Sequence, residues 1–332
     1  MDDHTLDRVW ETQLSLWFKS KEAERRRAAL RFYAIALPGL VASLALGWLT
    51  LKYTGVFEVA MAVGGGLALG FSWLGYGPLG AMQSDYRHQI LARVGGAFGM
   101  KYDARAPAGF PIAAFHQHDL VFSAPGGLDH HFHGESDGRL FGAARAEFTY
   151  KRADDEMLQR RNTDFSGVLL CLELEKRPAG EVILTRESEW FSELSRTGSS
   201  FSARQLNLID LGTRDVGGPY KAFCESQAIA ESVVTAGLLA GLTALEASFS
   251  GRPLRLAIVP VGQGGACYVA IDTSGVFEGF SILEDLEQRR RFDSLLREMA
   301  GIMNLVDLVV REIDGVDERD VEPNDSLAGA ST

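Results

Sequence analysis

Two long apolar runs near the N-terminus constrain this chain more than any other feature of its sequence. Phe32–Leu51 is twenty residues without a charge, and after a gap of seven residues Val59–Ser84 adds twenty-six more. A helix of about 20 apolar residues crosses the roughly 30 Å hydrocarbon core of a bilayer. Residues 32–84 are therefore predicted to form a transmembrane helical hairpin, with spans at about 32–51 and 59–82 and the lipid bilayer as a partner.

The basic residues predict the orientation of this hairpin. They crowd the two outer flanks of the runs, whereas the connecting loop Lys52–Glu58 contains a single lysine. The flanking residues are Lys19, Lys21, Arg25, Arg26, Arg27 and Arg31 before the first run, and Arg87, Arg93, Lys101 and Arg105 after the second. Because basic residues close to a span stay on the cytoplasmic side, both termini are expected to be cytoplasmic. Neither run contains Asp, Glu, Lys, Arg or His, which favours an anchor over an ion pathway.

Small residues recur at a spacing of four in both runs. They are Gly39, Ser43 and Gly47 in the first, and Ala62, Gly66 and Gly70 in the second. Such stripes let two helices approach closely. The pattern fits packing of the hairpin on itself, which we favour, and also fits association with a second copy of the chain.

Residues 1–31 are predicted to form an amphipathic helix, because apolar side chains recur there at helical spacing. The stripe is Leu6, Trp10, Leu14 and Trp17. Two locations remain open for this helix. It either lies on the inner membrane surface or packs on the soluble part of the chain.

Residues 85–311 are predicted to form an α+β domain, because strand and helix patterns do not alternate regularly. Strands are expected at Leu140–Tyr150, Val168–Glu175, Glu181–Thr185, Gln205–Leu211, Leu254–Val261 and Ala266–Ile271. Helices are expected at Tyr220–Ser226, Ser232–Ser248 and Ile282–Val310. Residues 312–332 form an acidic tail without an apolar face, which we expect to be disordered.

Three segments of this domain resemble the bacterial family known as domain of unknown function 3137. They are Phe141–Tyr150, Leu208–Glu246 and Ala266–Gly279, and the second contains the pair Lys221 and Phe223 before an Ala/Leu-rich helix. The resemblance extends over about residues 1–310. It implies an N-terminal helical segment, two membrane spans and a cytoplasmic α+β domain in a bacterial inner membrane. The family has no established activity, so the resemblance implies no reaction.

Charge and cysteine content exclude several classes of protein. The net charge is −11 and the soluble part has no basic stripe, so nucleic acid is not an expected partner. Cys171, Cys224 and Cys267 are odd in number and widely spaced, which argues against a disulfide framework. We expect buried free thiols in a reducing compartment.

A cluster of histidines is the one candidate for a chemical site. Five of the seven histidines lie between His116 and His133, and imidazole is the commonest protein ligand for zinc and related metals. If Pro125-Gly126 formed the tip of a hairpin, one face would carry the candidate metal ligands His116, His118, His131, His133 and Glu135. The alternative, which we favour, is a polar exposed loop in which these histidines bind nothing.

The sequence therefore favours a non-enzymatic protein over an enzyme. In this hypothesis the hairpin anchors a domain that binds another protein or a small ligand and that needs no cofactor. The small-residue stripes of the hairpin offer a surface for a second copy of the chain. The alternative is a membrane-anchored hydrolase that uses a divalent metal held by the histidine cluster. No phosphate-binding GxxxxGK[ST] motif and no GxSxG nucleophile motif occurs in the sequence.

Overall fold

The structure is a computed structural model that describes residues 3–122, 125–150, 162–185, 206–209, 211, 220–249, 254–273, 275–277 and 288–315. The chain divides into two compact units. The first contains residues 1–97 and 277–296, and the second contains residues 98–276 and 297–332.

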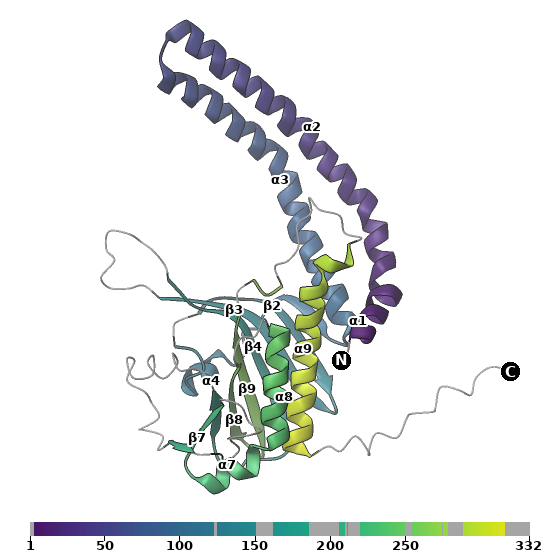
Figure 1. Cartoon of the computed structure of the whole chain (residues 1–332), viewed down its shortest axis with the longest axis vertical. Helices are drawn as coiled ribbons and strands as arrows, with labels where there is room; N and C mark the ends of the chain where they lie inside the picture. The colour runs from purple at the N-terminus through teal and green to yellow at the C-terminus, as the bar shows by residue number, and fades with distance from the viewer. Residues whose placement is uncertain are drawn as a thin grey trace, which may run out of the picture. The chain divides into compact units, whose positions relative to one another are not determined.

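The first unit is built around a long helical hairpin. After α1 (Asp3–Val9) and the π-helix η1 (Trp10–Leu14), the chain forms α2 (Ser15–Thr54) and α3 (Phe57–Ala97). The two long helices run side by side in opposite directions (Figure 1). Gly55, at φ 64°, ends α2 and donates its N–H to the Leu51 carbonyl, which makes the connection tight. Both helices contain stretches long and apolar enough to cross a membrane.

Small residues bring α2 and α3 together, as the first predicted stripe requires. A Cβ placed on Gly64 would lie 3.1 Å from the Ser43 carbonyl oxygen and 3.2 Å from the Cα of Gly47. The second stripe was assigned wrongly to this interface. Gly66 and Gly70 contact nothing on α2, and Gly64 takes their place.

The apolar stripe of the N-terminal segment is covered by protein. Leu14 and Phe18 are fully buried, and the rings of Trp10 and Phe18 stack at 5.0 Å. Both rings also contact Phe292 of the same unit, at 5.5 and 4.4 Å. Of the two locations that the sequence left open, this burial favours packing on protein. The predicted Trp17 is only partly buried, because the stripe continues four residues after Leu14, at Phe18.

The second unit contains one antiparallel sheet in which nine described strands follow the order β1-β2-β3-β4-β9-β8-β5-β7-β6. The strands are β1 (Lys101–Arg105), β2 (Pro125–Ser136), β3 (Arg139–Tyr150), β4 (Asn162–Leu174), β5 (Val182–Thr185), β6 (Asn207–Ile209), β7 (Lys221–Cys224), β8 (Leu254–Val261) and β9 (Gly264–Asp272). Because β1 and β6 end the order, they are the edge strands.

Both faces of the central strands are buried. On one face, α4 (Ile112–Gln117) places the ring of Phe115 against Tyr268 of β9, with centroids 5.3 Å apart. On the other face, α8 (Ala236–Glu246) and α9 (Asp293–Val309) lie side by side (Figure 1). The Ser226 hydroxyl caps α7 (Gln227–Val233), which precedes α8.

The α+β class is confirmed, whereas several predicted elements are wrong. Tyr220–Ser226 was predicted as a helix, yet it contains strand β7. Ser232–Ser248 was predicted as one helix, but the chain bends by 65° at the break between α7 and α8. Taken together as one bent segment, α7 and the helix that follows it are long and apolar enough to cross a membrane.

Other predictions fall partly outside the described residues. These are the tail at 316–332 and the start of the last predicted helix at 282–287. Glu312–Asp314, which we assigned to the tail, are helical and belong to the π-helix η4 (Val310–Asp314).

Asp314 fastens the end of η4 to the sheet. Its side chain is 1% exposed and accepts a hydrogen bond from Nε of Arg139 at 2.8 Å. The backbone N–H groups of Glu175 and Lys176, just after β4, also donate to this carboxylate, at 3.0 Å each. Arg139 in turn pairs with Glu175. A buried carboxylate with three donors is strongly stabilised by its partners.

Asp314→Ala is predicted to lower stability by about 3 kcal/mol, because it removes the acceptor of Nε of Arg139 and of two backbone N–H groups. The matched control is Asp307→Ala, which removes an exposed carboxylate that accepts one hydrogen bond from Ser136. This control should cost less than about 1 kcal/mol. Thermal unfolding of both variants in detergent measures the difference, and equal losses would contradict the assignment.

Candidate functional site

The structure separates the five predicted metal ligands into two groups. The prediction of a β-hairpin with its tip at Pro125-Gly126 is wrong. His116 lies on α4, and Pro125 begins strand β2 instead of forming a turn. β2 pairs with β1 on one side and β3 on the other. Only His131 and His133 come together, as alternate residues of β2.

Asp103 completes this group, and the sequence argument missed it. It lies on β1 directly across from His131. Its Oδ2 is 3.5 Å from Nδ1 of His131 and 3.2 Å from Nε2 of His133. The two imidazoles are nearly parallel, with centroids 5.1 Å apart. One ligand atom from each residue lies within 4.8 Å of the other two. We call Asp103, His131 and His133 the edge cluster.

His131 is the buried member of the edge cluster. Phe110 packs edge-on against its ring, and a Cβ on Gly142 would come within 3.1 Å of its Nε2. Burial lowers the pKa of His131, and the neighbouring His133 adds to this effect while Asp103 opposes it. The imidazole is therefore held neutral, which is the form that binds metal.

The other predicted ligands have partners elsewhere. Nδ1 of His116 donates to the Val121 carbonyl at 3.1 Å. Nδ1 of His118 donates to Glu181 at 2.8 Å. Glu135 is exposed, further along β2. These contacts join α4 to its surroundings, so His116 and His118 have a structural role.

His130 also lies apart from the edge cluster. Its φ is 50°, at a bulge where β2 has one residue more than β3. Its ring is hydrogen-bonded to the Tyr102 hydroxyl at 2.9 Å. Bulges re-aim side chains. Here the bulge pairs His130 with Tyr102, while His131 and His133 remain beside Asp103.

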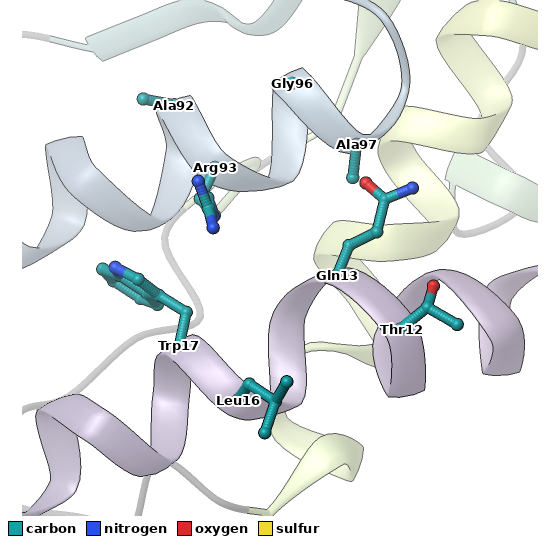
Figure 2. A pocket seen from close by; sticks show the side chains of 8 residues that line it. All are labelled: Thr12, Gln13, Leu16, Trp17, Ala92, Arg93, Gly96 and Ala97. Atoms are coloured by element: carbon teal, nitrogen blue, oxygen red, sulfur yellow. The ribbon is translucent and has the colours of Figure 1, made fainter. Parts of the chain in front are cut away.

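A cleft in the first unit is a second candidate site. It has a volume of about 680 Å³ and lies between the N-terminal helices and the end of α3 (Figure 2). Its lining residues are Thr12, Gln13, Leu16, Trp17, Ala92, Arg93, Gly96 and Ala97. The volume is in the range of known ligand pockets, about 300–1,000 Å³.

The cleft combines apolar surface with one positive charge. Leu16 is 72% exposed and Trp17 is partly exposed. In Figure 2, Gln13 and Trp17 project from the N-terminal helices toward the α3 segment that carries Arg93. The guanidinium of Arg93 is exposed and forms no ion pair within the described part of the chain. Sequence patterning identified Trp17 but not the cleft, because Arg93 is remote in sequence.

Comparison with known families identifies part of the α+β domain. Residues 163–310 match the model of the family described as Protein of unknown function (DUF3137). The predicted resemblance is confirmed over these residues. The DUF3137 segment contains β5 to β9, α7, α8, α9 and nearly all of β4. The helical hairpin, the cleft and the edge cluster lie outside it, so the match gives no information on either candidate site.

A solved structure also matches, at 9% identity and a TM-score of 0.30. It is the crystal structure of the mycobacterial trehalose monomycolate transport factor A, TtfA, and the match covers 67% of this chain and 94% of that one. A likeness this weak supports no statement about fold or function. Among curated proteins, none matches this sequence.

The three cysteines are free thiols, as predicted, and they are not activated. Burial raises the pKa of Cys171 to about 11 and also raises the pKa values of Cys224 and Cys267. Because the thiolate is the nucleophile, these side chains are poor candidates for covalent catalysis.

Alkylation of Cys171 is predicted to be at least about 100-fold slower at pH 8 than that of a free cysteine, because about one thiol in a thousand is ionised. Its rate should rise about tenfold per pH unit from pH 7 to 9, since the thiolate fraction grows until the pKa is reached. Mass spectrometry of iodoacetamide-treated protein measures this. Leu140→Cys, at a position 55% exposed, is the reactive control. Equal rates at both positions would contradict the burial argument.

Proposed function

We propose that this protein is a non-enzymatic binding protein anchored in a bacterial inner membrane. Its hairpin holds the N-terminal cleft and the α+β domain at the cytoplasmic face, where the cleft binds another protein. The observation that carries the proposal is the cleft, with an exposed leucine and a partly exposed tryptophan beside an arginine that has no ion-pair partner in the described chain.

The outer surface of the hairpin supports the anchor. Many of its large apolar side chains face outward, including Leu44 and Val41 at 66% exposed and Leu69 at 75%. Soluble proteins rarely expose a continuous apolar surface of this kind. A helix satisfies its own backbone hydrogen bonds, so such a surface is stable in lipid.

The orientation rests on the basic flanks. The connection between α2 and α3 is short, with Gly55 and Val56 between the helices. This end of the hairpin has one lysine, Lys52 in the last turn of α2, whereas the basic residues of the flanks lie toward the opposite ends of the two helices. The positive-inside rule therefore supports cytoplasmic termini and an external connection.

The chemistry of the cleft favours a protein partner with an apolar side chain next to an acidic one. Trp17 and Leu16 provide apolar contact, and interfaces are enriched in tryptophan and arginine. An acidic group would neutralise Arg93, whose charge is uncompensated within the described structure. A partner of this kind explains a partly exposed tryptophan beside a cation better than a purely apolar partner does.

A second copy of the chain is a further proposed partner, within the membrane. Gly66 and Gly70 have no neighbour within 4 Å of a built Cβ, so this face of α3 is open for close approach. The metal-dependent hydrolase stays a second prediction. The edge cluster favours it, because three ligands leave a coordination position for water, as in catalytic zinc sites.

Cysteine accessibility is expected to test the orientation. Val56→Cys, in the connection, should react with a membrane-impermeant maleimide in intact spheroplasts. Leu140→Cys, in the sheet domain, should react only after lysis. Both positions are exposed, at 44% and 55%, so protein burial does not separate them. The reverse pattern would overturn the topology.

Photo-crosslinking is expected to test the cleft. A benzoylphenylalanine at position 16 should form a discrete adduct with a partner protein in cells. Arg93→Glu should reduce this adduct about fivefold, because a lost exposed ion pair costs about 1 kcal/mol. The matched control is the same probe at position 140, outside the cleft. Adducts at position 16 that persist unchanged in Arg93→Glu would reject the cleft as the binding site.

A further inference from the structure

We infer that Asp103, His131 and His133 form a binding site for one divalent transition metal ion of the zinc class, at the β1 edge of the sheet. The inference is independent of the proposed cleft. Of the five ligands that the sequence suggested, this site keeps His131 and His133. Its third ligand is the carboxylate of Asp103, on the neighbouring strand β1.

The distances within the edge cluster fit metal coordination. Zinc bonds to histidine nitrogen and carboxylate oxygen are about 2.0–2.2 Å, so two ligands in a tetrahedron lie roughly 3.3–3.5 Å apart. Oδ2 of Asp103 lies 3.2 Å from Nε2 of His133 and 3.5 Å from Nδ1 of His131. The third pair, between the two imidazoles, is within 4.8 Å. A small rotation of exposed His133 can therefore complete the geometry.

Nδ1 of His131 is an independent sign of a ligand. The residue is 6% exposed, and its Nδ1 is buried without a hydrogen bond within the described structure. Buried polar atoms normally have a partner, and each exception requires an explanation. This atom faces Oδ2 of Asp103 at 3.5 Å, too far for a good hydrogen bond. A metal ion between the two would satisfy both.

The surrounding residues hold His131 in place. Phe110 packs edge-on against one side of its ring, at a centroid distance of 5.8 Å. Gly142 leaves room for Nε2, since any Cβ there would lie 3.1 Å away. Strand pairing fixes Asp103 across from His131. The ligands therefore come from two adjacent strands, and the buried one is pre-oriented.

The donor set selects the class of metal. Two imidazole nitrogens and one carboxylate oxygen suit Zn²⁺, Co²⁺, Ni²⁺ or Fe²⁺, whereas Mg²⁺ and Ca²⁺ prefer oxygen alone. Lys101, across from His133 on the same strand pair, opposes cation binding, and Asp103 offsets it.

A bound ion would have a structural effect, because it would link edge strand β1 to β2. Four of the five residues of β1 are exposed, and among the described strands β1 pairs with β2 alone. Edge strands with few buried contacts open most readily. Metal binding should therefore slow amide exchange in Lys101–Arg105, which gives a readout separate from metal content.

Zinc titration of the full-length protein in detergent tests the site. The protein carries an affinity tag without His or Cys and is first stripped with a chelator. We expect one Zn²⁺ per chain by calorimetry and elemental analysis. Asp103→Asn and His133→Ala should each weaken binding at least about tenfold, since even outer-shell changes cost about 10–100-fold. Both side chains are more than a third exposed, so both variants should fold.

The controls come from the same histidine-rich region. Glu135→Gln and His116→Ala should bind zinc like the unaltered chain, because neither residue reaches the edge cluster. Zinc should slow exchange in β1 of the unaltered protein but not of His133→Ala. Substoichiometric zinc, equal affinity in Asp103→Asn, or exchange in β1 that does not respond to zinc would each overturn the site.

Discussion

Burial of both faces of the central strands is the constraint on which the rest of the α+β unit depends. Consecutive residues of β9, such as Cys267 and Val269 on one face and Ala270 on the other, are all fully buried. An antiparallel sheet with one wet face would bury alternate residues only. This sheet therefore needs a helical layer on each side, which α4 on one face and α8 with α9 on the other provide. Asp314 stabilises this arrangement, because it connects η4, which follows α9, to Arg139 of β3 and to the backbone just after β4.

In the hairpin, by contrast, large apolar side chains lie on the outer surface and not in a buried core. There, Leu69 and Trp73 face outward, and the backbones of Gly47 and Gly64 come into close contact. A sheet would expose unpaired backbone groups in lipid, whereas each helix pairs its own. One chain thus buries apolar side chains inside its sheet domain and exposes them on the outer surface of its hairpin. The sharp change in pattern near residue 85 reflects these two environments.

Elements with strong local signals could be predicted from the sequence, and those stabilised by distant partners could not. β8 was predicted at its observed bounds, because a mainly apolar run ends at a glycine-rich turn. β7 was mistaken for a helix, since its strand conformation comes from pairing with β5 and β6. β2 was interpreted as a loop, because its polar and glycine-rich residues lack an apolar face. Pairing with β1 and β3 overrides that composition.

Only part of the edge cluster could be predicted from the sequence around the histidines. Side chains alternate along a strand, and this rule alone placed His131 and His133 on one face. The third member, Asp103, is 28 residues earlier in a short polar segment, and only strand pairing brings it to His131. His116 and His118 were predicted as ligands in error, because this segment forms α4 and its C-cap and not a strand beside β2. Each histidine is hydrogen-bonded to another residue, Val121 or Glu181. A metal site between strands therefore depends on register, which the sequence of neither strand specifies by itself.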